Sequence, residues 1–317
     1  MQRDEGGRGI GSLTRPGQLL DAAELLMGAG TDGSKGTVIL TGFPCLRDRT
    51  PPVESDGPPG AVALAFTLLA LGRAPVTMPI EDHSVDVLRR CAAALPATTH
   101  PPVVASFPTA DRWTPADDER LSALRTGAAS VLSIERAGNS ADGTCYTMRG
   151  YPMGDSLLGR INEIATPGCG VPTIGIGDGG NELGMGSLHA EVCQAVPLGD
   201  KIGCVIAADA PLVASVSNWG GYALCCAVAL LSWDDQHVQA LDGEAGGAPT
   251  PEAHLSRLVM DRAVAAQVHS AMNEAGALDG ITSAGDGSVD GMPLEAQLVV
   301  LDELRAIALE AMQQGER

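Results

Sequence analysis

The chain has 317 residues, and 20 Lys and Arg residues against 39 Asp and Glu residues give it a net charge of −19. A chain this acidic repels phosphate backbones and anionic lipids, which excludes nucleic-acid and membrane-surface partners. Its 44% hydrophobic residues exclude a disordered chain, and its length suits two domains or one large α/β domain. The longest apolar runs, Ala61–Leu71 and Tyr222–Leu231, are shorter than the ~20 residues that span a bilayer.

The N-terminus and the cysteines indicate a cytoplasmic protein. Residues 1–13 carry charges and glycines rather than the apolar segment of a signal peptide. None of the eight cysteines forms a C-x-x-C pair, and several lie in apolar segments. This pattern is typical of reduced, structural thiols rather than of a disulfide framework or a zinc site.

The first half of the chain begins with a lead-in, residues 1–35, that contains a predicted helix over Gln18–Met27. A β-branched strand over Gly36–Thr41 then opens a single large domain, residues 36–317. A Pro-rich loop follows over residues 42–60, and structureless loops of this length are usually functional or disordered. The later elements of this half are predicted strands at Pro75–Met78 and Val103–Ser106 and helices at Ala61–Leu71, Ser84–Ala94 and Pro115–Thr126.

The second half alternates strands with helices. Buried strands are predicted at Val131–Glu135, Thr173–Gly177 and Cys204–Ala208, and helices at Asp155–Ile164, Leu183–Ala195 and Trp219–Leu231. This alternation predicts an α/β fold, with a mostly parallel sheet and helices on both faces. The chain should close with a surface loop near residues 236–251 and helices at Glu252–Glu274 and Leu294–Met312.

An acidic residue ends or follows each of the three strands predicted in this half: Glu135, Asp178 and Asp209. Ligands of open parallel sheets bind beyond the carboxyl ends of the strands, so we expect these acids to share a site. Gathered carboxylates repel one another unless a proton or a cation lies between them, and Mg²⁺ or Mn²⁺ suits oxygen ligands. The alternative is that each acid caps the helix or turn after it.

The densest polar segment is Gly175–Gly186, in which Asp178, Asn181 and Glu182 stand among glycines. Its glycines let a ligand approach the backbone, whereas a plain Gly-rich turn explains only one or two of its polar residues. The segment also contains G-x-G-x-x-G, but Asp178 and Glu182 would place negative charge where a pyrophosphate must bind. We therefore expect no nucleotide cofactor.

Two other segments carry candidate binding residues. Arg47, in the Pro-rich loop, could hold a substrate carboxylate, because a guanidinium binds a carboxylate through two hydrogen bonds. Ser217 and Asn218 open an apolar helix, where free backbone N–H groups could hold an anion. A solvated loop and an ordinary capped helix are the alternatives. The apolar run Tyr222–Leu231 is compatible with an oligomer interface, although a buried helix explains it as well.

Several motifs together resemble the D-glutamate cyclase C-terminal domain family, from about Gly36 to Pro293. The motifs, in order, are Thr41–Pro44, Glu54–Ala61, Ser133–Gly138, Gly175–Gly186, Ser217–Tyr222 and Val289–Gly291. Cyclases of this name interconvert D-glutamate and 5-oxo-D-proline with loss of water. The resemblance therefore implies a lyase that acts on a small acidic amino acid or its lactam.

The chemistry of lactam closure suggests hypothetical roles for the candidate residues. The catalytic group is Asp178, Glu182, Asn181 and Glu135, and a divalent Mn or Mg ion would be held by Asp178, Glu182, Asp209 and Glu135. Substrate contacts are expected from Glu54, Asp56, Arg47, Ser217, Asn218, Gly179 and Gly180, with Glu54 or Asp56 on the ammonium group. Two alternatives stay open. The same carboxylates would serve a metal-dependent phosphatase or other hydrolase, and a non-enzymatic binding module would bind its ligand without turnover.

Overall fold

The computed structural model describes residues 10–30, 33–97, 100–166, 168–233 and 250–315. Its centre is a parallel sheet of six strands in the order β3-β2-β1-β4-β7-β8. The strands are β1 (Gly36–Gly42), β2 (Val76–Glu81), β3 (Val103–Phe107), β4 (Ala128–Arg136), β7 (Thr173–Gly177) and β8 (Ala210–Val213). A small antiparallel pair, β5 (Cys145–Tyr146) and β6 (Pro152–Met153), lies beside it. The predicted α/β fold is confirmed.

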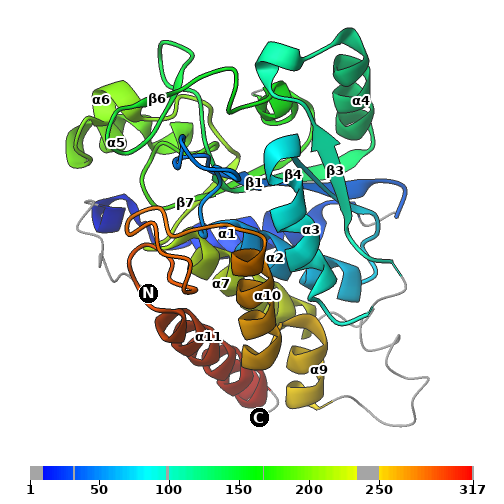
Figure 1. Cartoon of the computed structure of the whole chain (residues 1–317). Helices are drawn as coiled ribbons and strands as arrows, with labels where there is room; N and C mark the ends of the chain where they lie inside the picture. Colours follow the sequence, from blue (N-terminus) through cyan, green and yellow to red (C-terminus); the bar gives the residue numbers. More distant parts are fainter. Residues whose placement is uncertain (1–9, 31–32, 98–99, 167, 234–249, 316–317) are drawn as a thin grey trace.

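Helices cover both faces of the sheet (Figure 1). One face carries α1 (Gln18–Gly28), α2 (Pro58–Ala70), α3 (Val85–Ala93), α7 (Ser217–Trp233), α9 (Pro251–Leu258), α10 (Arg262–Glu274) and α11 (Leu294–Gly315). The other carries α4 (Pro115–Thr126), α5 (His189–Ala195), α6 (Gly199–Ile202) and 3₁₀ turns, among them η4 (Arg160–Ala165). Further 3₁₀ turns are η1 (Ile10–Leu13), η2 (Asp82–Ser84), η3 (Ala110–Arg112) and η5 (Gly186–Leu188).

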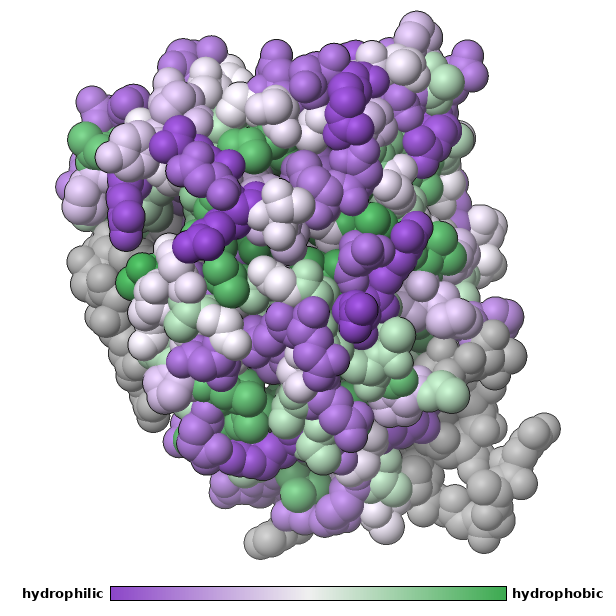
Figure 2. Space-filling view, in the orientation of Figure 1, coloured by the Kyte–Doolittle hydropathy of each residue, from purple (hydrophilic) through white to green (hydrophobic). Residues whose placement is uncertain are grey.

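Side chains alternate between the two faces along each strand, as the pleat requires. In β1, Ile39 packs in the core under α2 and α7, whereas Val38 and Leu40 pack with Leu121 of α4. The apolar helix α7 lies inside the first core, so the run Tyr222–Leu231 is a mainly buried helix of the fold. Among the described residues, no helix has both the length and the apolar character needed to cross a membrane. On the face in Figure 2, hydrophobic residues lie in small patches between hydrophilic ones.

The strand order creates a switch point between β1 and β4. From β1 the chain moves outward to β2 and β3, and from β4 it moves the other way to β7 and β8. The connections therefore diverge at the carboxyl ends of β1 and β4, where Thr41 pairs with Ile134 and Gly42 with Arg136. In doubly wound sheets this divergence opens the crevice that holds the ligand.

Four predicted elements differ from those observed. Cys204–Ala208 is not a strand; the edge strand is β8, which starts after Asp209. Turns and η4 replace the helix predicted at Asp155–Ile164. The helix predicted at Leu183–Ala195 starts only at His189, after the 3₁₀ turn η5.

The helix predicted at Glu252–Glu274 is also wrong, because two helices occupy it. They are α9 and α10, and the side chain of Asp261 caps α10 by accepting a hydrogen bond from the Val264 amide. An aspartate at this position satisfies a backbone N–H that would otherwise lack a partner. The predicted surface loop near residues 236–251 falls almost wholly outside the described residues.

Candidate active site

A pocket of about 360 Å³ opens at the carboxyl ends of β1, β4 and β7. Segments that are far apart in the sequence line it, including the Pro-rich loop after β1 and the segment before α11. Its charged lining residues are the acids Asp48, Glu54, Glu135, Asp178, Glu182 and Asp290 and the arginines Arg47, Arg49 and Arg149.

Glu135 lies near the end of β4 with a φ angle of +43°, in the left-handed region that non-glycine residues seldom adopt. Its Oε2 accepts a hydrogen bond of 2.6 Å from the Ser217 hydroxyl at the start of α7. Burial raises the pKa of Glu135 well above its usual value, and the charges of Asp178 and Glu182 raise it further. Burial and the neighbouring charges therefore favour the protonated form of this carboxyl.

Asp56 occupies the N-terminus of α7. Its Oδ2 accepts a hydrogen bond from the Ser217 amide at 2.7 Å, and its Oδ1 accepts from the amides of Asn218 and Gly57 at 2.8 and 2.9 Å. The anion expected at the free N–H groups of Ser217 and Asn218 is thus a carboxylate of the protein itself. Burial and the charge of Asp290 raise the pKa of Asp56 to about 8, although the three N–H donors act to lower it.

Asn218 caps a second helix in return. Its Oδ1 accepts hydrogen bonds from the amides of Gly57 and Gly60, at 3.1 and 2.7 Å, at the start of α2. Asp56 and Asn218 therefore join the N-termini of α2 and α7, and both side chains are almost fully buried. Neither residue lines the pocket. Their hydrogen bonds cap the N-termini of α2 and α7.

Glu182 holds the Gly-rich loop together. Its carboxylate accepts hydrogen bonds from the amides of Gly179 and Gly180, both at 2.7 Å, and a longer one of 3.3 Å from the amide of Asp178. Burial raises the pKa of Glu182, against these three donors. The amides of Gly179 and Gly180, expected to contact the substrate, thus bind a side chain of their own loop.

Asp178 and Asn181 lie in the same loop, directly after β7, and both line the pocket. The Asn181 amide group donates a 2.7 Å hydrogen bond to the carbonyl of Tyr146. Its Oδ1 is buried and has no hydrogen-bond partner among the residues that the structure describes. An oxygen in this state is suited to accept from a ligand or to coordinate a cation.

The segment before α11 contributes an acid that the sequence analysis did not assign, Asp290. The Ser55 amide donates to the carbonyl of Leu278, and the Ser55 hydroxyl to that of Ser288, which joins this segment to the Pro-rich loop. Asp290 itself adopts a φ of +55°. The motif Val289–Gly291 was a signal for it, but a local sequence does not reveal that this turn faces Glu54 and Glu135. Other unassigned lining residues are Cys45, Arg149 and Tyr151.

The acids can hold a metal ion. One carboxylate oxygen from each of Asp56, Glu135 and Asp178 lies within 4.8 Å of the others. All three ligand atoms are carboxylate oxygens, which suits a hard divalent cation. The residues thus fit such a group, with Glu135 and Asp178 exposed to the pocket and Asp56 behind them.

Asp209 does not belong to this site. It precedes β8, and its Oδ2 accepts hydrogen bonds from the amide and the hydroxyl of Thr173, both at 2.8 Å, at the start of β7. In a parallel sheet these positions mark the amino edge, opposite to the edge that carries Asp178. The expectation that Asp209 joins the other carboxylates was wrong because its strand was misplaced.

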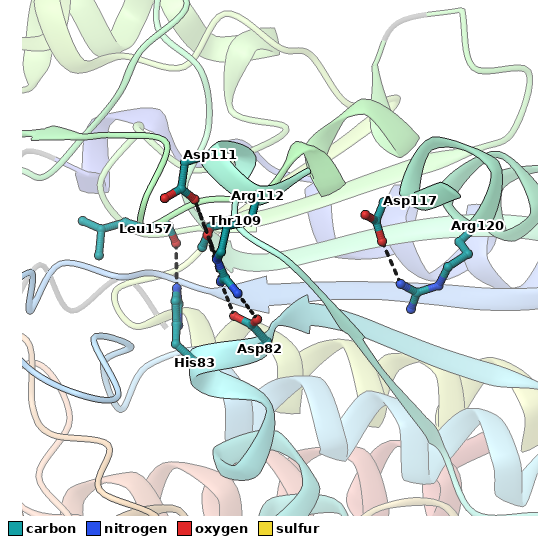
Figure 3. A network of polar contacts seen from close by, with 8 residues as sticks. All are labelled: Asp82, His83, Thr109, Asp111, Arg112, Asp117, Arg120 and Leu157. Carbon is teal, nitrogen blue, oxygen red and sulfur yellow. Dashed lines mark hydrogen bonds and ion pairs between the residues drawn. The ribbon is translucent and has the colours of Figure 1, made fainter. Parts of the chain in front are cut away.

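A polar network supports the wall beside the pocket. Arg136 is fully buried and donates to both carboxylate oxygens of Glu81, at 2.6 and 2.7 Å. Next to Glu81, the exposed Arg112 forms two 2.7 Å hydrogen bonds with Asp82 (Figure 3). His83 contacts the carbonyl of Leu157 at 2.9 Å. These contacts fasten the segments after β3 and β6 to the end of β2.

The fold and the site define a doubly wound α/β protein whose pocket lies at the switch point of the sheet. A family model described as "D-glutamate cyclase-like, C-terminal" matches residues 1–305, and the chain belongs to this family. It is 34% identical over 267 residues to the Homo sapiens protein named "D-glutamate cyclase, mitochondrial". The match covers 78% of this chain, which spans 40% of that relative's length.

Proposed function

We propose that this chain interconverts D-glutamate and 5-oxo-D-proline with loss or gain of water. The observation that carries the proposal is the cluster of buried carboxyl groups, charged and neutral, in a small pocket with arginines at its rim. The family membership supports the same reaction. The substrate would be a small acidic amino acid, and no nucleotide is needed.

The reaction forms one carbon–nitrogen bond and moves protons from the substrate nitrogen to the departing oxygen. The substrate nitrogen forms a bond to the carbon of the γ-carboxylate, and the bond between that carbon and one of its two oxygens breaks. Two protons leave the ammonium group and two arrive at the departing oxygen, so that water is released and the net charge is conserved. A site for this reaction needs one group that accepts a proton and another that donates one.

The carboxyl groups of the pocket supply both. Because burial and the neighbouring charges favour the protonated form of Glu135, this carboxyl would donate to the departing oxygen. Asp178, which lies next to it, would take a proton from the substrate nitrogen, and Glu54 would hold the ammonium group. Asn181 Oδ1 would accept a hydrogen bond from the same nitrogen.

A divalent Mn or Mg ion would be held by Asp178 and Asp56, while Glu135 keeps the proton that it donates. When bound, such an ion neutralises carboxylate charge and polarises the γ-carboxylate. A phosphatase would use similar oxygen donors, but the six acids of the pocket repel a phosphate ester more strongly than a zwitterionic amino acid.

The experiment is proton NMR of D-glutamate and 5-oxo-D-proline with metal-stripped protein, repeated with Mn²⁺ or Mg²⁺. We expect interconversion in the presence of metal and a loss of about 100-fold or more in Glu135→Gln, since proton donation contributes about that much. The side-chain oxygen of the glutamine can still accept a hydrogen bond from the Ser217 hydroxyl. Asp209→Asn, at the opposite edge, is the control and should keep wild-type turnover. Wild-type protein that converts neither compound under any condition overturns the proposal.

A further inference from the structure

Charge is divided within the pocket between its floor and its mouth. The floor acids Glu54, Glu135 and Asp178 are 7%, 5% and 1% exposed. The exposed charged residues of the lining are three arginines, Arg47, Arg49 and Arg149, and one acid, Asp48, so the mouth carries a net positive charge. A ligand that fits this division carries a positive group at its inner end and a negative group at its outer end.

Arg149 stands on a turn that the structure holds in place. The turn joins β5 to β6, and the Gly150 amide donates to the carbonyl of Thr147 at 2.8 Å. Gly150 has a φ of +74°, which glycine adopts without strain. Lys201 then donates from its Nζ to the carbonyl of Gly150 at 2.9 Å. The side chain of Arg149 therefore projects from a fixed backbone position.

A second arginine-bearing turn meets the first across the mouth. Arg47 lies in the turn closed by the hydrogen bond from the Arg49 amide to the carbonyl of Leu46, at 2.8 Å. Its guanidinium carbon is 4.8 Å from the centre of the Tyr151 ring, which follows the turn of Arg149. This cation–π contact brings together two turns that are about a hundred residues apart in the chain.

We propose that Arg149, with Arg47 beside it, binds the α-carboxylate of the substrate and so determines that the substrate is an α-amino acid. The inference rests on the proposed function. Ring closure requires the nitrogen and the γ-carboxylate to lie together on the floor, where Glu54 holds the ammonium group and the protonated Glu135 donates to the γ-carboxylate. The α-carboxylate is the one charged group left over, and it is attached to the carbon that bears the nitrogen. It therefore faces the mouth, where a guanidinium can bind it through two hydrogen bonds.

The test compares D-glutamate with 4-aminobutanoate, which has the same reacting groups but no α-carboxylate. Wild-type protein, Arg149→Gln and Arg90→Gln are assayed with both compounds for kcat/KM by NMR and for thermal stabilisation by the bound compound. Arg90 is an exposed arginine of α3 that does not line the pocket, so its variant removes the same charge elsewhere.

Arg149→Gln should lower kcat/KM for D-glutamate about tenfold or more, mainly through KM, since a charge-assisted hydrogen bond is lost. Its kcat/KM for 4-aminobutanoate should match that of wild type, and Arg90→Gln should match wild type for both compounds. Equal losses for both compounds, or no loss for D-glutamate in an active enzyme, overturn the role of Arg149. Stabilisation by D-glutamate that depends on Arg149, but without turnover, retains the binding role and overturns the proposed reaction. Wild-type protein that neither binds nor converts D-glutamate overturns both.

Discussion

Arg136 follows Glu135 in the chain, yet its charge is directed away from the pocket. Successive residues of a strand point to opposite sides, and the guanidinium of Arg136 lies against Glu81 with neither side chain more than 3% exposed. Burial acts to raise the pKa of Glu81, but the charge and hydrogen bonds of Arg136 outweigh it and lower that pKa. The acids of the pocket floor are thus left without this cation.

Replacing Glu81 by Gln should destabilise the fold by about 3–5 kcal/mol, because it leaves the buried guanidinium of Arg136 without a counter-charge. The measurement is urea-induced unfolding at neutral pH. Asp82→Asn is the matched control: it weakens the neighbouring exposed pair with Arg112, which contributes about 0–1 kcal/mol. Similar losses in the two variants would contradict this account.

At the scale of elements, the sequence predicts best where the local signals agree. The helix Pro115–Thr126 has the predicted bounds, because Thr114 and Asp117 form a capping box and Pro115 occupies the first turn. Strands β1 and β7 were also found, as β-branched or apolar runs between glycines. When the intrinsic propensity, the hydrophobic pattern and the capping residues of a segment agree, its structure can be predicted without knowledge of its neighbours.

The strand predicted at Cys204–Ala208 was misplaced because the local signals of this segment disagree with the position of the strand in the sheet. Residues 204–208 form an apolar run, whereas β8 contains Pro211, which argues against a strand when the sheet position is unknown. β8 is an edge strand, where proline is tolerated. The helix break at 259–261 was missed for a similar reason, because the apolar pattern continues through it and only Asp261 signals the new start.

The contact between α10 and α7 should make stability depend on pH. His269 of α10 is fully buried, its Nε2 lies 3.1 Å from the Tyr222 hydroxyl, and burial lowers its pKa to about 4. An unfolded histidine has a pKa of about 6.5, so between these values the unfolded chain binds one more proton. The contribution of the neutral His269 to the free energy of unfolding is therefore fully present above about pH 6.5 and is lost as the pH falls towards 4.

The measurement compares the free energy of unfolding of wild type and His269→Gln from pH 7.5 to 4.5. The difference between the two proteins should change by up to about 1.4 kcal/mol per pH unit inside this window, to the disadvantage of wild type at low pH. Other titrating groups cancel in the difference, and glutamine still reaches the Tyr222 hydroxyl. Parallel curves across the window would show that His269 does not titrate as described.

At the scale of the whole molecule, helix α1 of the lead-in packs into the core of the domain. Ala22, Ala23 and Leu26 of α1 pack in the same core as α7. The division of the chain into a lead-in, residues 1–35, and a domain, residues 36–317, therefore stays a proposal. The cytoplasmic location also stays a prediction. The sequence placed Glu135, Asp178 and Glu182 at one edge of the sheet, but the mutual capping by Asp56 and Asn218 depends on tertiary contacts that no local pattern encodes.

A chain with charge −19 that gathers carboxylates in one pocket should gain stability from a divalent cation. Mn²⁺ at about 100 times its Kd should raise the free energy of unfolding by about 2.7 kcal/mol, since the folded pocket binds it and the unfolded chain does not. Calorimetry with and without a chelator measures this effect. Asp178→Asn should lose most of it, and Asp209→Asn should keep it. Equal stabilisation of both variants would place the ion elsewhere.

The mutual capping of α2 and α7 also bears on biosynthesis. The amides of Gly57 and Gly60 leave the ribosome well before their acceptor, Asn218, and Asp56 leaves it well before its partners, the amides of Ser217 and Asn218. Domains fold as units during synthesis. A nascent chain that ends before residue 217 therefore carries an Asp56 and an α2 terminus without these partners, and the two helix ends can be capped only after Ser217 and Asn218 have been translated.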